Sequence, residues 1–145
     1  MIYWHLVENP TGKTYEQLIQ VLCEHSDSFY FITRKELCYK AQILEQFHPY
    51  VIDIYESKQW AGTVTEGPAA TIYVMEANKE TCKLLQQLSI SLFDWVAPHL
   101  PEDLTFLKDD EVLFSSTTHE KMGCFELNEQ HEQLIDQIEG LKLEN

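Results

Sequence analysis

An acidic stretch in the C-terminal third of the chain holds the residues with the most useful chemistry. Glu102 and Asp103 follow Pro101, and His119 and Glu120 lie at the end of the same stretch. Carboxylates and an imidazole can serve as acid and base if the fold brings them into one cleft. A plainer interpretation is that Pro101 fixes the backbone while Asp103 accepts hydrogen bonds in a turn. We favour this structural interpretation, because any acidic hairpin supplies such residues.

The pattern does not predict a metal site. The six histidines are scattered, and no HxH, HExxH or CxxC spacing occurs. Zinc takes three or four ligands that usually follow short, regular spacings. His119 and Glu120 are adjacent, and adjacent residues of a strand point to opposite faces. The glycine-rich phosphate motifs and the G-x-S-x-G element are also absent. We therefore expect no metal, no other cofactor and no assigned catalytic residue.

A tryptophan in a polar connection is a second candidate contact. Trp60 lies beside Gly62 and close to Thr63, and an exposed tryptophan is a typical anchor for a protein partner. The alternative is that Trp60 folds back over the edge of the core. The candidate binding residues are therefore Trp60, Thr63, Glu102, Asp103, His119 and Glu120.

The four cysteines are Cys23, Cys38, Cys82 and Cys124. They are widely separated and form no CxxC pair. Three of them lie among apolar residues or on the core faces of expected helices. In a cytosolic protein this pattern favours buried free thiols over disulfides or metal ligands.

Length and charge limit the class of protein. With 145 residues and 44% hydrophobic residues, the sequence predicts one globular domain over residues 1–145. A net charge of −14 argues against binding to nucleic acid or to an anionic membrane surface. Residues 101–145 carry 12 of the 24 acids but only 3 of the 10 Lys and Arg. Without a basic N-terminal segment or a long apolar run, we expect no signal peptide, no membrane span and a cytoplasmic location.

The elements that must position these residues follow from hydrophobic spacing. Helical spacing predicts helices over residues 14–25, 37–47, 79–89 and 128–143, with a shorter helical piece at 91–98. Thr14 with Gln17 matches a capping box, and Asn78 can cap the third helix. Strand-like runs occur at residues 28–33, 50–57, 69–77, 103–107 and 112–116, with further candidates at 2–8 and 123–127, and residues 58–68 read as a hairpin-like connection. We predict an α+β fold: a largely antiparallel sheet of five or six strands with about four helices packed on one face.

Several short motifs in this sequence resemble those of a known protein family. The resemblance rests on W-x-G-T at Trp60–Thr63, the Phe93–Trp95 segment, P-E-D-L-x-F at Pro101–Phe106 and the serine-to-His-Glu element ending at Glu120. Together they resemble a family of small uncharacterised proteins from spore-forming Gram-positive bacteria, over roughly residues 28–127. The family often carries proline where Ala61 stands here, a departure that bears on the rigidity of this loop. The resemblance implies no established activity.

Three functional hypotheses remain open. The first, which we favour, is a non-catalytic binding protein whose acidic surface receives a basic protein, as immunity-type inhibitors do. The second is a small-ligand-binding protein or enzyme that uses Glu102, Asp103, His119 and Glu120. The third is a homodimer formed through the apolar face of the expected C-terminal helix.

Overall fold

A single antiparallel sheet of eight strands dominates the computed structural model, which describes residues 1–145. The strand order is β10-β1-β9-β8-β7-β2-β6-β3. The bounds are β1 (Ile2–Leu6), β2 (Ser28–Thr33), β3 (Val51–Ser57), β6 (Ala70–Glu76), β7 (Glu102–Lys108), β8 (Glu111–Thr117), β9 (Met122–Leu127) and β10 (Leu143–Glu144). The α+β class and the antiparallel sheet are confirmed, but the prediction of five or six strands was too low. The two further candidates at residues 2–8 and 123–127 form β1 and β9, and β10 lies where a helix was expected.

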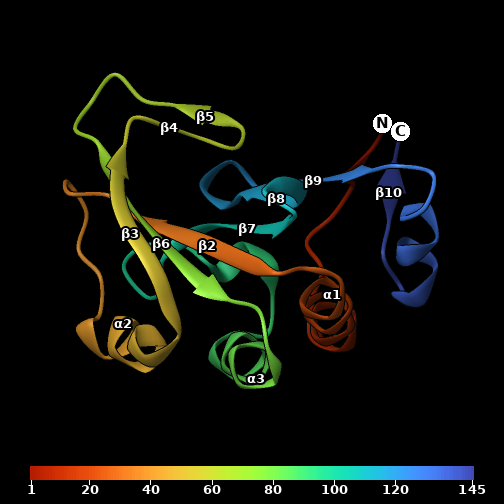
Figure 1. Cartoon of the computed structure of the whole chain (residues 1–145), viewed down its shortest axis with the longest axis horizontal. Coiled ribbons are helices and arrows are strands. Elements are labelled where there is room, and N and C mark those ends of the chain that lie inside the picture. Colours follow the sequence, from red (N-terminus) through yellow and green to blue (C-terminus); the bar gives the residue numbers. More distant parts are fainter.

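Three α-helices lie on one side of this sheet (Figure 1). They are α1 (Gly12–His25), α2 (Ala41–Phe47) and α3 (Lys79–Leu88). The chain also forms four short 3-10 helices: η1 (His48–Tyr50), η2 (Leu92–Asp94), η3 (Thr118–Glu120) and η4 (Glu132–Gln137). The cap expected at Asn78 is confirmed, since its side chain accepts a hydrogen bond from the Thr81 N–H at 2.9 Å. The helix expected from residue 37 begins at Ala41, and the helical piece expected at 91–98 is only the short η2.

The main core lies between the helices and the sheet. An apolar stripe of α1 is fully buried there: Tyr15, Leu18, Ile19 and Leu22. The Tyr15 hydroxyl donates to the Leu85 carbonyl of α3 at 2.5 Å and accepts from the Trp95 indole N–H at 2.9 Å. This buried pair of hydrogen bonds joins α1, α3 and the segment after η2.

A smaller apolar cluster covers the opposite face of the sheet. It contains Tyr30, Ile32, Trp60, Ala70 and Ile72. Trp60 comes from a hairpin of two short strands, β4 (Gln59–Trp60) and β5 (Thr63–Val64), which lies across this face (Figure 1). The hairpin expected over residues 58–68 is thus confirmed. Trp60 is only 7% exposed, so it folds back over the edge of the core, as the alternative interpretation of this residue predicted.

The C-terminal helix expected over residues 128–143 is not formed. The chain makes the 3-10 helix η4, turns at Gly140 with a φ of 79°, and adds β10 to the free edge of β1. Helical spacing alone could not foresee this outcome, because a strand edge that satisfies backbone groups competes with the helix. Leu134 and Ile138 are buried in the main core, so the apolar face invoked for a homodimer is already covered.

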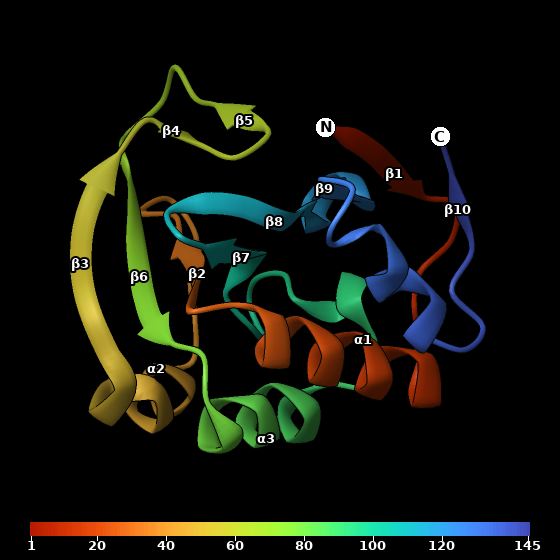
Figure 2. The same cartoon turned by 45° about the vertical axis from the view of Figure 1, so that its right-hand side comes forward.

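The capping box expected at Thr14 and Gln17 is also wrong. The helix α1 begins earlier, at Gly12. The Thr14 hydroxyl donates to the Glu139 carbonyl at 2.8 Å, and the Gln17 side chain accepts from the Glu139 N–H at 2.7 Å. Both side chains therefore attach the C-terminal segment to α1 instead of capping the helix. Figure 2 shows this segment beside α1.

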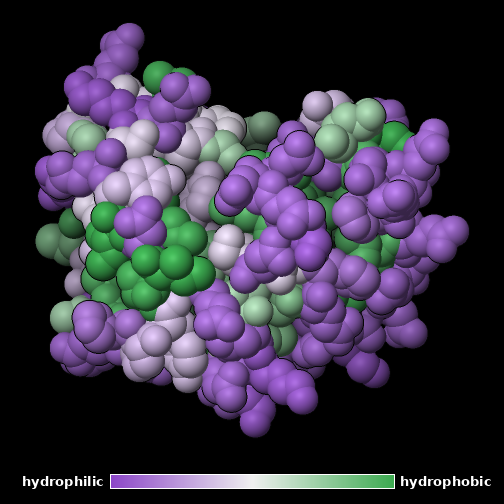
Figure 3. Space-filling view, in the orientation of Figure 1, coloured by the Kyte–Doolittle hydropathy of each residue, from purple (hydrophilic) through white to green (hydrophobic).

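The strand β3 forms the other edge of the sheet and exposes apolar side chains. Ile52 is 61% exposed and Ile54 is 50% exposed. Figure 3 shows a hydrophobic patch on the side of the molecule where β3 lies. No helix of the structure is long and apolar enough to cross a membrane.

Candidate functional site

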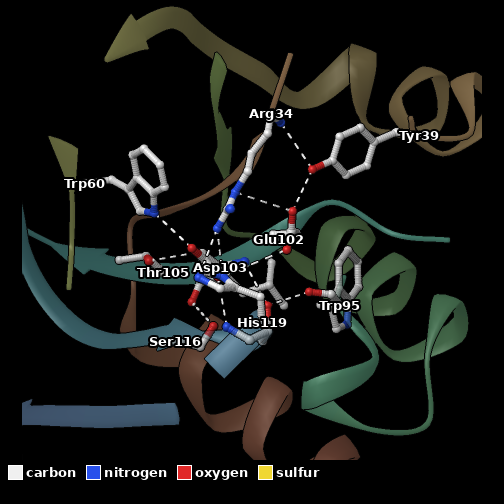
Figure 4. Close-up of polar contacts among 11 residues, drawn as sticks. Arg34, Tyr39, Trp60, Trp95, Glu102, Asp103, Thr105, Ser116 and His119 are labelled. Atoms are coloured by element: carbon white, nitrogen blue, oxygen red, sulfur yellow. Dashed lines mark hydrogen bonds and ion pairs between the residues drawn. The ribbon is translucent and has the colours of Figure 1, made fainter. Parts of the chain in front are cut away.

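The two acids singled out in the sequence lie at the start of β7, next to a β-bulge. The register between β2 and β7 shifts between Tyr30 and Ile32, and Asp103 has a φ of 60°. In a regular strand, Glu102 and Asp103 would point to opposite faces. The irregular backbone at the bulge changes this alternation, and both carboxylates approach the same imidazole, that of His119. Figure 4 shows this polar cluster, which consists of Arg34, Tyr39, Trp60, Glu102, Asp103 and His119.

Asp103 is fully buried, and both of its carboxylate oxygens accept hydrogen bonds. Oδ2 accepts from the Trp60 indole N–H at 2.9 Å, and Oδ1 accepts from the Thr118 N–H at 2.9 Å. The Asp103 N–H in turn donates to the Thr118 hydroxyl at 3.2 Å. A buried carboxylate is tolerated only with such partners. Asp103 therefore joins β7 to the β4–β5 hairpin and to η3.

Glu102 is 2% exposed and is held by the segment that follows β2. The Tyr39 hydroxyl donates to Glu102 Oε1 at 2.7 Å and accepts from the Arg34 N–H at 3.1 Å. The Arg34 Nε lies 3.7 Å from the same carboxylate oxygen. Burial, and then the hydrogen bond to Glu102, raise the pKa of Tyr39, so the phenol stays protonated and keeps donating.

His119 and Arg34 form the partly exposed side of the cluster. His119 Nδ1 lies 3.7 Å from Asp103 Oδ1 and 4.0 Å from Glu102 Oε2. The Arg34 Nη2 lies 2.8 Å from Nδ1 and 3.0 Å from Nε2 of the same ring. A guanidinium can only donate, so it approaches the ring as a hydrogen-bond donor. His119 therefore lies between one cation and two carboxylates.

The hydroxyl groups near these carboxylates already donate to backbone carbonyls. Ser116 donates to Leu104 at 2.8 Å, Thr105 donates to Asp103 at 3.0 Å, and Thr118 donates to Trp95. A serine or threonine nucleophile instead needs its proton directed at a base. No group of three or more His, Cys, Asp or Glu side chains is placed to hold a metal ion. The cluster joins four separate chain segments through buried charges and hydrogen bonds.

Four of the six candidate residues come together in this cluster: Trp60, Glu102, Asp103 and His119. Thr63 lies opposite Trp60 in the small hairpin, and Glu120 is exposed beside the cluster; no hydrogen bond or ion pair joins either side chain to it.

Sequence reasoning missed Arg34, Tyr39 and Thr118. One signal was available for the first of these, because Arg34 is the only arginine of the chain. A buried pair of acids needs a cation, and arginine is the residue most often used for that purpose. Nothing in the spacing pointed to Tyr39 or Thr118, which reach the acids through the tertiary fold.

No protein-family model, curated protein or solved structure matches this chain. The resemblance to small proteins of spore-forming bacteria therefore stays a prediction.

Proposed function

We propose that this chain is a non-catalytic binding protein whose acidic surface receives a basic protein. The observation that carries the proposal is the excess of unpaired surface acids. Ion pairs are confined to the carboxylates of Asp27, Glu56, Glu102 and Asp103, although the chain carries 24 acids and a net charge of −14. Such a surface field raises the association rate of an oppositely charged protein and repels acidic ones.

Residues 101–145 carry 12 of the 24 acids, and nine of these are here named the acidic C-terminal surface. It consists of Asp109, Asp110, Glu111, Glu126, Glu129, Glu132, Asp136, Glu139 and Glu144, none of which is buried. Three of them, Asp109, Glu111 and Glu126, line one hollow of about 150 Å³, where the β7–β8 turn meets the end of β9. Hydrophilic residues cover the side of the molecule where η4 and β10 lie (Figure 3).

Glu126 gives this hollow a specific electrostatic property. Partial burial raises the pKa of Glu126, because the charged carboxylate loses part of its hydration there. Lys108 and His131 also line the hollow, and Lys108 already pairs with Asp27. A lysine or arginine of a partner placed against Glu126 would stabilise the charged carboxylate and so compensate for its lost hydration. The hollow therefore supports a partner with a projecting basic side chain.

The internal pairing of the polar cluster supports a non-catalytic role. Both oxygens of Asp103 are occupied, and Glu102 accepts from Tyr39. A general base must instead be within reach of a proton on a substrate. The cluster is better suited to fix the sheet and the β4–β5 hairpin than to turn over a substrate.

A second candidate function follows from one observation, the convergence of Glu102, Asp103 and His119 within 4.0 Å. With His119 partly exposed, this group could hold a small ligand or move a proton. This alternative predicts that His119→Gln abolishes ligand binding or turnover while the folded structure persists. Capture of a basic protein by His119→Gln at the wild-type level would favour the first proposal.

The test is capture of proteins from the chain's own host at low salt, followed by elution with increasing salt. We expect a basic protein to bind and to elute as salt rises, because screening weakens exposed charge pairs. The binding variant combines Asp109→Asn, Glu111→Gln and Glu126→Gln. Its matched control removes three exposed acids elsewhere, through Glu16→Gln, Glu45→Gln and Glu80→Gln.

The two variants have the same net charge, so they separate a local surface from overall charge. The proposal predicts that the binding variant loses the basic protein while the control retains it. Equal capture by both variants would contradict it, as would a bound protein that resists elution by salt.

A further inference from the structure

The strand β3 leaves one edge of the large sheet open. It pairs with β6 on one side, and no strand lies on its other side. All residues from Ile52 to Glu56 are exposed, so both faces of the strand reach solvent. At the opposite end of the sheet, β10 has only two residues and offers little edge for pairing. The edge of β3 is therefore the long one available to another chain, and proteins commonly add a strand at such a place.

The sequence of β3 does not block such pairing. Proteins usually protect an exposed edge with lysine, proline or a β-bulge. Between Val51 and Ser57 there is no Lys, Pro or Gly, and the single register shift lies at the start of the strand, before Asp53. Valine, isoleucine and tyrosine, which favour strands, occupy four of the seven positions. The stretch from Asp53 to Ser57 can therefore continue the sheet.

An apolar hollow of about 310 Å³ lies beside this edge, on the side of the sheet where α2 packs. Four of the six residues that line it are hydrophobic: Leu44, Val51, Ile54 and Tyr73. Ile54 is 50% exposed there, and Figure 3 shows the hydrophobic patch on this side of the molecule. A strand added to β3 would remove this apolar surface from water, which favours association.

The charge around β3 permits a second copy of this chain to approach. Residues 34–58 carry four Lys or Arg and four Asp or Glu, although the net charge of the chain is −14. Glu56 already pairs with Lys35 at 2.6 Å. The acids of η4 and β10 lie at the far end of the sheet (Figure 1). Eight strands span roughly 30 Å, several times the Debye length of about 8 Å at physiological salt. Two copies that meet at β3 therefore keep these acids apart.

We propose that β3 is a dimerisation edge, at which β3 of a second copy adds in antiparallel orientation and extends the sheet across both molecules. Full overlap of the two strands places Ile54, the middle residue, opposite itself. In this register Asp53 lies opposite Tyr55. Glu56 lies opposite Ile52, so no acid faces an acid. Opposed residues project to the same face of a sheet, so Ile54 of the second copy covers the apolar hollow.

Sedimentation velocity at physiological salt, over a range of protein concentrations, tests the proposal on the full chain. We expect the wild type to pass from monomer to dimer as concentration rises. In Ile54→Lys, we expect the dissociation constant to rise by about tenfold or more, because the contact is symmetric and each copy loses an apolar side chain and gains a charge. The matched control is Ile90→Lys, which makes the same change at a residue that is 75% exposed and lies outside β3. It should dimerise like the wild type.

Hydrogen exchange of the wild type locates the contact without any variant. Amides of residues 51–57 should exchange more slowly at high concentration than at low concentration, because the second copy accepts their hydrogen bonds. Added salt should strengthen this dimer by screening the repulsion between two acidic chains, whereas it dissociates the basic protein of the proposed function. The two proposals can therefore fail separately.

Three results would overturn the dimerisation edge. The first is a wild type that stays monomeric at the highest concentration. The second is equal dimerisation of folded Ile54→Lys and Ile90→Lys, with circular dichroism as the check on folding. The third is a dimer in which residues 51–57 gain no protection from exchange, since the copies would then meet at another surface.

Discussion

Asp103 is the residue that holds the polar cluster together. It is fully buried, and its side chain accepts from Trp60 and Thr118, which lie 43 and 15 residues away in the sequence. Its left-handed φ of 60° costs a non-glycine residue about 1 kcal/mol. The charge-assisted hydrogen bonds offset that cost only while both oxygens remain acceptors.

Asp103→Asn tests this account with little change in shape or backbone preference, because asparagine also tolerates the left-handed region. One acceptor becomes an NH₂ group that faces the N–H of either Trp60 or Thr118. We expect the free energy of unfolding to fall by about 2 kcal/mol in urea denaturation, the usual effect of an unsatisfied buried donor.

The matched control is Asp53→Asn on the exposed face of β3, which should change stability by less than about 0.5 kcal/mol. If Asp103→Asn were as mild as this control, the hydrogen bonds of the cluster would not be what holds these segments together.

The β7–β8 turn shows the same left-handed strain at the scale of an element. Lys108 pairs with Glu111, so Asp109 and Asp110 form a two-residue hairpin turn, with φ values of 52° and 64°. Such turns need positive φ at both central residues and prefer glycine at the second. The β7–β8 hairpin therefore has an aspartate, Asp110, at the turn position where glycine is preferred.

Asp110→Gly should raise the free energy of unfolding by about 0.5–1 kcal/mol, because glycine adopts positive φ without steric cost. Thermal unfolding measures the gain. Asp110→Asn removes the same charge but keeps a side chain, and it should give a smaller increase. Equal gains in the two variants would mean that charge repulsion, not backbone strain, limits the turn.

The start of β2 is joined to this turn by an ionised carboxylate. Asp27 accepts from the Asp109 N–H at 2.7 Å and from the Lys108 ammonium at 3.1 Å. These bonds lower the pKa of Asp27 from its ordinary value of 3.8, with the backbone bond as the larger cause. Because the folded pKa lies below the unfolded one, this stabilisation is complete above about pH 4 and is lost as pH falls through the folded value.

Asp27→Asn should therefore lower the melting temperature at pH 7, and the difference from the wild type should shrink as pH falls below 3.8. Melting temperatures of both proteins between pH 7 and pH 2 provide the measurement. A difference that stays constant with pH would show that the charge of Asp27 contributes nothing.

Local patterns predicted most elements, but not the ones that depend on distant partners. Alternation and turn residues correctly placed every strand of the main sheet except β10, together with the β4–β5 hairpin, and Asn78 correctly marked the start of α3. The C-terminal helix failed because β10 completes the edge of β1, a contact across nearly the whole chain. For the same reason, the spacing of Glu102, Asp103 and His119 predicted candidates but not their partners Arg34 and Tyr39. Those partners depend on the pairing of β2 with β7 and on the bulge at Asp103.

At the scale of the whole molecule, charge repulsion is the main unbalanced force. The net charge is −14, and few of the surface acids form ion pairs. Repulsion among like charges destabilises a compact state, and dissolved salt screens it. We expect sodium chloride to raise the melting temperature between about 0.01 M and 0.15 M, where the Debye length falls from about 30 Å to about 8 Å.

The variant that combines Asp109→Asn, Glu111→Gln and Glu126→Gln should melt higher than the wild type at low salt and show a weaker salt response. A melting temperature that falls as salt is added would mean that attractive ion pairs outweigh the repulsion.

Native mass spectrometry of the chain, isolated gently from its own host at low salt, tests the proposed function most directly. The account predicts a complex with a basic protein, which dissociates as salt is raised and which the Asp109, Glu111 and Glu126 variant does not form. A chain that carries a small molecule or a metal ion and no protein would contradict it.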